Sequence, residues 1–215
     1  IGGGGHGLGA AYFLAKEHGI TNVAVLEKGW LGGGNTGRNT MTVRSNFLRE
    51  DSVPFHEMSL DLYHQLSRDL NYNLMVSQRG MITFIQSSAA NRIALQMANT
   101  MHIYGAEYRM LTLDEVKQKI PIFDPSPNMR LPVRGGVYQP RASMVRHDAV
   151  AWGFARAADA RGVDIIQNCE VTGIDIKKNK CVGVTTTRGP IKGGKIACCV
   201  AGSSSQVLSL IHISE

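Results

Sequence analysis

The sequence has no apolar run that approaches the roughly 20 residues of a membrane span, so we expect no membrane partner. Its cysteines form no C-x-x-C pair and have no histidine at metal-ligand spacing, so no metal site is expected. These cysteines are Cys169, Cys181, Cys198 and Cys199. We interpret them as buried thiols in a reducing compartment, which predicts a cytoplasmic location.

Basic residues are in excess, but they are scattered along the chain rather than gathered in a stripe. The formal charge of +6 permits an acidic partner or an anionic ligand, and without an accompanying motif we expect no nucleic acid. The 215 residues are 43% hydrophobic and 19% charged, an ordinary composition for a globular protein. The chain begins at Ile1, directly before a glycine loop and without an initiator methionine, which predicts a fragment of a longer protein.

The opening stretch GGGGHGLGAAYFLAKEHG has the pattern of a dinucleotide-binding turn. Gly2, Gly4 and Gly7 stand at G-x-G-x-x-G spacing, which serves a tight turn, close backbone approach to a pyrophosphate, and helix packing, respectively. The helix that follows ends at Gly19, and VAVLE then reads as a buried parallel strand. Glu27, about twenty residues past the last motif glycine, is placed to accept hydrogen bonds from a ribose.

The pattern predicts a cofactor cradle but does not choose between NAD and FAD. Backbone N–H groups at the helix start suit a diphosphate, and we assign Gly5, His6 and Lys28 to the same site. A second glycine-rich stretch, GGGNTGRNT, offers further polar side chains for a diphosphate or a ring edge: Asn35, Thr36, Arg38 and Thr40. The alternatives are a merely tight turn at the first stretch and a flexible surface loop at the second.

The rest of the chain alternates helices and strands. A helix is expected from Ser52, a strand in GMITFIQ, and a helix ending at Gly105. Thr112 and Glu115 form a capping-box pattern that starts a short helix. A further helix is expected from Asp148 to Arg161, then strands with a turn at residues 178–180, and a final strand in KIACCVAG.

This order predicts an α/β fold, a Rossmann-like dinucleotide-binding domain with part of an inserted α+β domain. We expect residues 1–50 to form the first part of the dinucleotide domain and 51–140 to belong to the insert. Residues 141–205 would return to the first domain. Residues 206–215, which end in VLSLIHISE, are expected to be a non-native or disordered tail.

Several stretches resemble the β subunits of heterotetrameric sarcosine oxidases, within the D-amino-acid-oxidase class of FAD-dependent oxidoreductases. They are the opening 40 residues, LNYNLMVSQRG, MVRHDAVAWGFARAADARGVDIIQ and EVTGI. The resemblance implies the N-terminal part of a subunit that oxidises sarcosine with noncovalent FAD, passes electrons to a covalent FMN, and forms hydrogen peroxide. It also implies α, γ and δ partner subunits, and a product that passes to tetrahydrofolate or hydrolyses to glycine and formaldehyde. For the fold, the resemblance implies that the dinucleotide domain is an FAD-binding domain of the glutathione-reductase type and that the insert is a substrate domain.

The same resemblance implies roles for particular residues. His147 would carry the FMN, and Arg44 would bind the substrate carboxylate; the alternative for Arg44 is an exposed ion pair with Glu50 or Asp51. Asp148 is a plausible helix cap that could orient the histidine ring. The remaining residues assigned to the cofactor are Thr42, Val171, Ala201 and Gly202.

Three functions therefore stay open. The leading one is a flavin-dependent amine oxidoreductase acting on sarcosine or another secondary amine, or on dimethylglycine. The second is an NAD-dependent dehydrogenase, against which the long insertion between Gly29 and Arg146 argues. The third is a basic module that binds a nucleotide or nucleic acid without catalysis. We expect the fragment alone to have no amine-oxidising activity.

Overall fold

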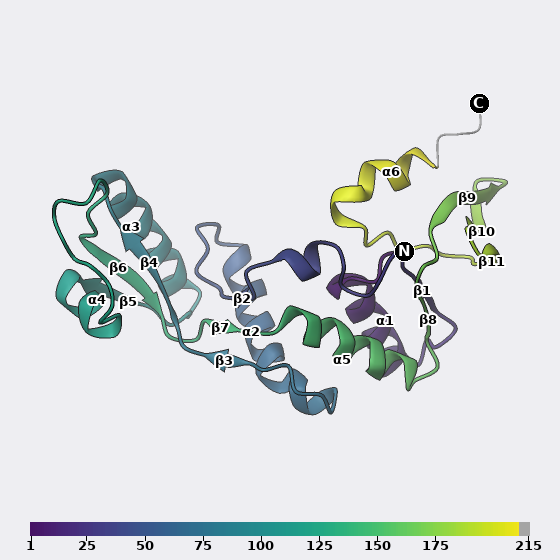
Figure 1. The fold of residues 1–215 in the computed structure, drawn as a ribbon, viewed down its shortest axis with the longest axis horizontal. Helices are drawn as coiled ribbons and strands as arrows, with labels where there is room; N and C mark the ends of the chain where they lie inside the picture. The colour runs from purple at the N-terminus through teal and green to yellow at the C-terminus, as the bar shows by residue number, and fades with distance from the viewer. Residues whose placement is uncertain (211–215) are drawn as a thin grey trace. The chain divides into compact units, whose positions relative to one another are not determined.

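A computed structural model describes residues 1–210 and divides the chain into two compact units. The first unit comprises residues 1–40, 68–74 and the chain from 146 onward, and the second comprises 41–67 and 75–145. The divisions fall at 40/41 and 145/146 instead of the expected 50/51 and 140/141. The reason is strand pairing, because residues 42–43 and 143–144 belong to one small sheet. Figure 1 labels the elements along the chain.

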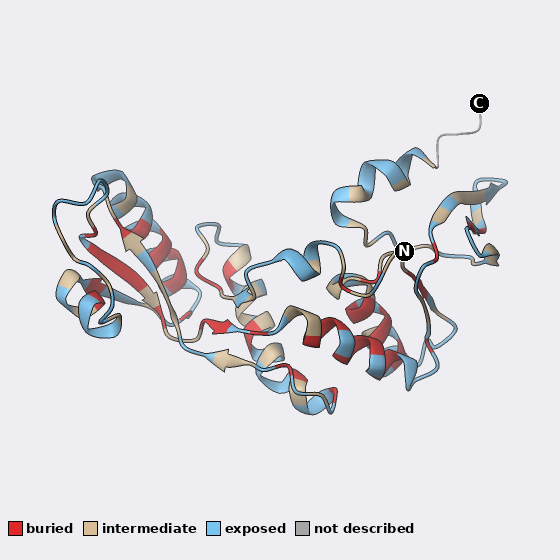
Figure 2. Ribbon diagram, viewed as in Figure 1, coloured by how far each residue is buried: buried red, intermediate tan, exposed pale blue. Residues whose placement is uncertain are grey.

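The first unit opens with the expected helix and parallel strand. Helix α1 (Gly5–His18) buries Leu8, Ala11, Tyr12 and Ala15 and ends, as expected, at Gly19, which has φ of 61°. It packs against α5 (His147–Asp159), where the rings of Tyr12 and Phe154 lie 5.5 Å apart. Figure 2 shows buried residues along both helices. Strand β1 (Ala24–Leu26) pairs in parallel with β8 (Asp164–Ile166).

Backbone hydrogen bonds extend this two-stranded sheet. Gly2 donates its N–H to the carbonyl of Leu26 at 2.8 Å, and Cys199 donates to the carbonyl of Ile1 at 2.8 Å. The segment around Cys199 therefore lies beside the first residues of the chain, which lie beside β1. The expected strand in KIACCVAG is not a regular strand in the structure. Its hydrogen bonds to Ile1 run from the Cys199 N–H to the Ile1 carbonyl and from the Ile1 amino group to the Ala197 carbonyl.

An antiparallel meander follows, formed by β9 (Val171–Lys177), β10 (Lys180–Thr186) and β11 (Gly189–Lys192). Its first turn has Lys178 and Asn179 at φ of 50° and 58°, the tight hairpin geometry at the expected position. Leu26, Cys169 and Val184 form the local core. The short helix η2 (Ala201–Ser203) and the helix α6 (Ser204–Ser209) follow. The expected non-native or disordered tail, residues 206–215, overlaps α6, and residues 211–215 lie outside the described part.

Segment 68–74 joins the first unit although the sequence assigns it to the insert. The side chains of Leu70 and Leu74 lie directly over Gly153 of α5, where an added Cβ would come within 3.0 and 3.2 Å of them. Arg156, also on α5, donates to the carbonyl of Asn71 at 2.9 Å. The leucine side chains can approach α5 this closely because Gly153 has no side chain. Segment 68–74 therefore belongs to the first unit together with α5.

The second unit contains two antiparallel sheets of three strands. One has the order β2 (Thr42–Val43), β7 (Ser143–Met144), β3 (Ser77–Gln78). The other has the order β4 (Met81–Ile85), β6 (Gly135–Gln139), β5 (Arg109–Thr112). Helix α3 (Ser88–Ile103) contributes Ala94, Met97 and Met101 to a core with Ile85 and Val137, visible as buried residues in Figure 2.

Two sequence signals in this unit are confirmed at the level of single hydrogen bonds. Thr112 and Glu115 form the capping box of α4 (Leu113–Lys119), with the Thr112 N–H 2.7 Å from the Glu115 carboxylate. Gly105 follows α3 at φ of 69°, and Ala106 donates to the carbonyl of Met101 as helix-ending glycines allow.

The helix α2 (Ser52–Asp69) forms where expected, but its apolar spacing does not mark a buried face throughout. Its buried residues are Val53, Leu60 and Leu66. Phe55 and Met58 are more than half exposed. None of the helices among residues 1–210 has the length and apolar character that crossing a bilayer requires.

Candidate functional site

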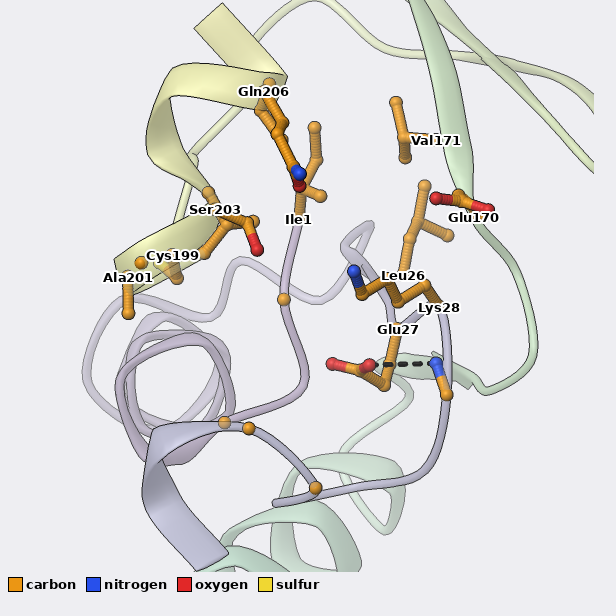
Figure 3. A pocket seen from close by; sticks show the side chains of 18 of the residues that line it. Ile1, Leu26, Glu27, Lys28, Glu170, Val171, Cys199, Ala201, Ser203 and Gln206 are labelled. Atoms are coloured by element: carbon orange, nitrogen blue, oxygen red, sulfur yellow. Dashed lines mark hydrogen bonds between the residues drawn. The ribbon is translucent and has the colours of Figure 1, made fainter. Parts of the chain in front are cut away.

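A cavity of about 920 Å³ lies in the first unit where the glycine turn, the end of β1 and the start of β9 meet. Figure 3 shows Glu27 and Lys28 near its centre, with Val171 on one side and Gln206 of α6 on the other. Its volume is at the upper end of the range usual for small-molecule and cofactor sites. Nine residues that the sequence assigns to a cofactor line it: Gly2, Gly4, Glu27, Lys28, Asn35, Arg38, Val171, Ala201 and Gly202.

The three motif glycines have different roles. Gly2 has φ of 104°, and a Cβ there would lie 2.5 Å from the carbonyl oxygen of Cys199. A Cβ on Gly7 would lie 2.0 Å from the carbonyl oxygen of Gly2. Gly4 lines the cavity, and a Cβ on it would meet only the Thr36 hydroxyl at 3.0 Å. Gly2 and Gly7 therefore keep the turn folded, as their spacing predicts, whereas Gly4 keeps backbone accessible from the cavity.

The N-terminus of α1 has one side-chain partner. The Gly5 N–H donates to the hydroxyl of Thr36 at 2.9 Å, so Thr36 from the second glycine stretch caps the helix from outside. Gly5, His6, Gly7 and Thr36 do not line the cavity themselves. A ligand here would meet the positive end of the helix dipole across Gly4, the N-cap residue.

The Glu27 carboxylate is held rigidly by backbone. One oxygen accepts from the Gly3 N–H at 2.7 Å and the other from the Gly29 N–H at 2.9 Å, the kind of contact marked by the dashed line in Figure 3. A carboxylate offers about four acceptor positions, so about two remain for ligand hydroxyls. The side chain is thus preorganised as an acceptor at the cavity.

The lining contains both signs of charge. Lys28 and Arg38 supply cations, and Asn35 and Arg38 belong to the short helix η1 (Asn35–Arg38) within the second glycine stretch. Glu170 adds an acid that the sequence analysis did not single out. Other lining residues missed at that stage are Trp30, Cys199, Ser203 and Gln206. Of these, Trp30 could have been singled out from the sequence, because it is a large aromatic residue in a glycine-rich stretch.

The cysteines are only partly as expected. All four are free, but Cys169 alone is buried, and Cys198 is exposed. Cys199 lines the cavity.

Arg44 and Thr42 lie in the second unit, and Thr40 lies in the first unit outside the cavity lining. The ion pair considered for Arg44 does not form, because Asp51 pairs with Arg49 at 2.7 Å. Instead the Nη1 atom of Arg44 donates to the backbone carbonyl and the side-chain oxygen of Asn46, at 2.9 and 2.8 Å. Burial lowers the pKa of Arg44, which has no carboxylate partner among the described residues.

His147 is the first residue of α5, and its Nδ1 is buried without a hydrogen-bond partner among the described residues. The expected role of Asp148 as cap and orienting group is wrong. The N-cap is Arg146, whose guanidinium binds the Asp148 carboxylate through Nε at 2.9 Å and Nη2 at 2.5 Å. That hydrogen bonding lowers the pKa of Asp148.

The glycine turn, the parallel strands and Glu27, the acid expected to bind a ribose, define a dinucleotide-binding α/β protein. The chain matches the family described as "FAD dependent oxidoreductase" over residues 1–213 and belongs to that family. Family membership resolves the choice that the glycine motif left open, in favour of FAD. The match also runs through most of the tail that the sequence analysis set apart.

The chain is similar to known sarcosine oxidase subunits. It is 50% identical to the sarcosine oxidase subunit beta of Rhizobium meliloti over 210 residues, which cover 98% of this chain and 50% of that protein. It is 49% identical to the corresponding subunit of Arthrobacter sp., with coverage of 98% and 52%. The chain thus spans about half the length of these relatives.

Solved structures support the fold. L-proline dehydrogenase from P. horikoshii superposes with a TM-score of 0.89 at 24% identity, covering 100% of this chain and 55% of that one. Glycine oxidase from Bacillus cereus gives a TM-score of 0.84 at 24% identity, covering 99% and 57%. These likenesses confirm the predicted fold class.

Proposed function

We propose that this chain supplies the FAD site of an enzyme that oxidises the secondary amine sarcosine. The observation that carries the proposal is the cavity where Gly4, the α1 N-terminus and the backbone-held Glu27 carboxylate meet. The similarity to sarcosine oxidase β subunits supports the choice of substrate.

The residues present fit FAD. Gly4 leaves the space that a Cβ would fill, and the helix N-terminus favours the negative diphosphate. Arg38 adds a cation at the cavity, which suits the same group. Glu27 would accept from the adenosine ribose, and the backbone at Val171 would meet the adenine.

When bound, the flavin supplies the two-electron acceptor for oxidation of a carbon–nitrogen bond. The proposed overall reaction converts sarcosine, water and oxygen to glycine, formaldehyde and hydrogen peroxide. In the presence of tetrahydrofolate, the one-carbon unit would pass to the folate instead of being released. We assign the substrate carboxylate to Arg44, whose guanidinium is desolvated and lacks an acid of its own.

We further propose that His147 carries a covalently bound FMN. Its Nδ1 is buried and unpartnered among the described residues, so no hydrogen bond from them holds the ring in one tautomer. Attachment would replace one C–H bond of the flavin methyl group by a bond to the neutral imidazole nitrogen, with loss of a proton. The two electrons released would reduce the flavin ring, which oxygen, the oxidant of the proposed reaction, would reoxidise.

The proposed assembly contains α, γ and δ subunits besides this one, in the cytoplasm. Four free thiols are compatible with a reducing compartment. The alternative substrate is another secondary amine or the tertiary amine dimethylglycine. Sarcosine is also the substrate named for human mitochondrial sarcosine dehydrogenase, a relative at 28% identity.

The test is a substrate panel on the complete purified assembly, with peroxide formation and flavin bleaching as readouts. Sarcosine should give the highest kcat/KM of the secondary amines. A flavin-containing assembly that oxidises dimethylglycine but not sarcosine would replace the substrate assignment, and a colourless active assembly would overturn the proposal.

A further inference from the structure

We propose that Asn46 is a positioning residue that turns one edge of the Arg44 guanidinium toward a carboxylate ligand. The inference rests on the proposed function, because it specifies how Arg44 would bind the carboxylate of sarcosine. It depends on side chains of the second unit alone.

Asn46 occupies one end of the guanidinium. The Nη1 amino group has two hydrogens, and Asn46 offers two acceptors to it, its backbone carbonyl at 2.9 Å and its Oδ1 at 2.8 Å. For Nε and Nη2, no hydrogen bond to the described residues is found. These two nitrogens form the fork that binds a carboxylate through two parallel hydrogen bonds.

Asn46 is itself fixed. It is 2% exposed, and its amide nitrogen donates to the hydroxyl of Thr83 on β4 at 3.1 Å. The preceding residue, Ser45, is fully buried, and its N–H donates to Gln139 on β6 at 3.1 Å. The backbone that carries Asn46 is therefore tied to two strands of one sheet.

Aromatic packing holds the flat face of the guanidinium. The Cζ of Arg44 lies 4.3 Å from the centre of the Phe47 ring, and Phe47 stacks on His56 with ring centres 4.2 Å apart. Burial and the charge of Arg44 lower the pKa of His56, which favours the neutral ring beside this cation. The face and one end of the guanidinium are thus occupied.

What is absent from this arrangement is an anion. Glu57, which is hydrogen-bonded to Ser45, is paired with Arg141 and not with Arg44. No carboxylate among residues 1–210 pairs with Arg44. A half-buried cation held in one orientation and without a counter-charge is a site for an external anion, and the fork selects a planar carboxylate.

The experiment compares acetate with its neutral analogue acetamide on the complete assembly. Binding is followed by broadening of the ligand methyl NMR signal, which does not require flavin. We expect Asn46→Ala to weaken acetate binding about 10-fold, the loss of one charge-assisted hydrogen bond, and to leave acetamide unchanged. The same variant should raise KM for sarcosine more than it lowers kcat.

Two further variants separate positioning from folding. Thr83→Val removes only the anchor of Asn46, so it should weaken acetate binding less, about 3-fold. Thr100→Ala removes a buried hydrogen bond of the same unit, to the carbonyl of Gln96, and should leave acetate binding unchanged.

Unchanged acetate affinity in folded Asn46→Ala, or in Thr83→Val should Asn46→Ala fail to fold, would overturn the proposal. Equal weakening of acetate and acetamide would also overturn it, because it would indicate general damage. If the wild-type assembly contains FAD and oxidises sarcosine but does not bind acetate, only the positioning role of Asn46 is disproved. An assembly without FAD or amine oxidation sinks the proposed function.

Discussion

Gly4→Val separates ligand binding from folding at the glycine turn. A Cβ at Gly4 meets only the Thr36 hydroxyl, at 3.0 Å, and the backbone there is extended, with φ of −88°. Shifting Thr36 would weaken its bond to the Gly5 N–H, and valine is a poorer N-cap than glycine. We expect a stability cost of about 1 to 2 kcal/mol, which a folded domain tolerates.

The effect on FAD should be much larger. The valine side chain would occupy the space through which a diphosphate approaches the backbone, and each lost charge-assisted hydrogen bond costs about 1.5 to 3 kcal/mol. Losing two corresponds to a dissociation constant at least about 100-fold higher. The assay is a titration of the flavin-free complete protein with FAD, alongside thermal unfolding.

Two other glycines provide the controls. Gly194→Val places the same side chain where nothing lies within 4 Å and outside the cavity, so FAD affinity should not change. Gly7→Ala forces a Cβ to within 2.0 Å of the Gly2 carbonyl oxygen, so it should prevent folding of the turn. Normal FAD affinity in folded Gly4→Val would refute the assignment of this turn to the diphosphate.

Three other substitutions test separate parts of the account. Glu27→Gln should raise the FAD dissociation constant about 10-fold or more in the same titration, and an unchanged value would mean that the ribose lies elsewhere. His147→Ala should abolish the fluorescent flavin peptide of a digested assembly while leaving acid-extractable FAD, so a peptide that persists would exclude attachment there. The folded-state pKa of His56 is lowered, so the unfolded chain takes up a proton first and stability should fall as the pH drops below about 6.5. Urea unfolding of His56→Phe should lose part of this pH dependence, and an identical slope would show that His56 does not cause it.

Local signals in the sequence predicted local structure well. The Thr112 capping box and the hairpin turn at Lys178 and Asn179 involve neighbours in sequence, so the residue types nearly determine the geometry. The glycine spacing and Glu27 likewise predicted the cavity, because one continuous turn–helix–strand unit places them together.

Contacts between distant segments were not predictable in this way. Ser203 and Gln206 reach the cavity only because the chain returns beside Ile1, which no periodicity in the tail indicates. For Arg44, charge alone suggested nearby acids, whereas the partner is the uncharged Asn46, anchored on a strand that comes later in the chain. Apolar residues at helical spacing likewise do not specify what covers a face, and Phe55 and Met58 of α2 are exposed.

Flavin content of the complete protein tests the central claim most directly. Acid precipitation should release about one FAD per chain into the supernatant, with any covalent flavin remaining in the pellet. A folded protein that releases no FAD, and binds none when FAD is added, would contradict the assignment of this cavity.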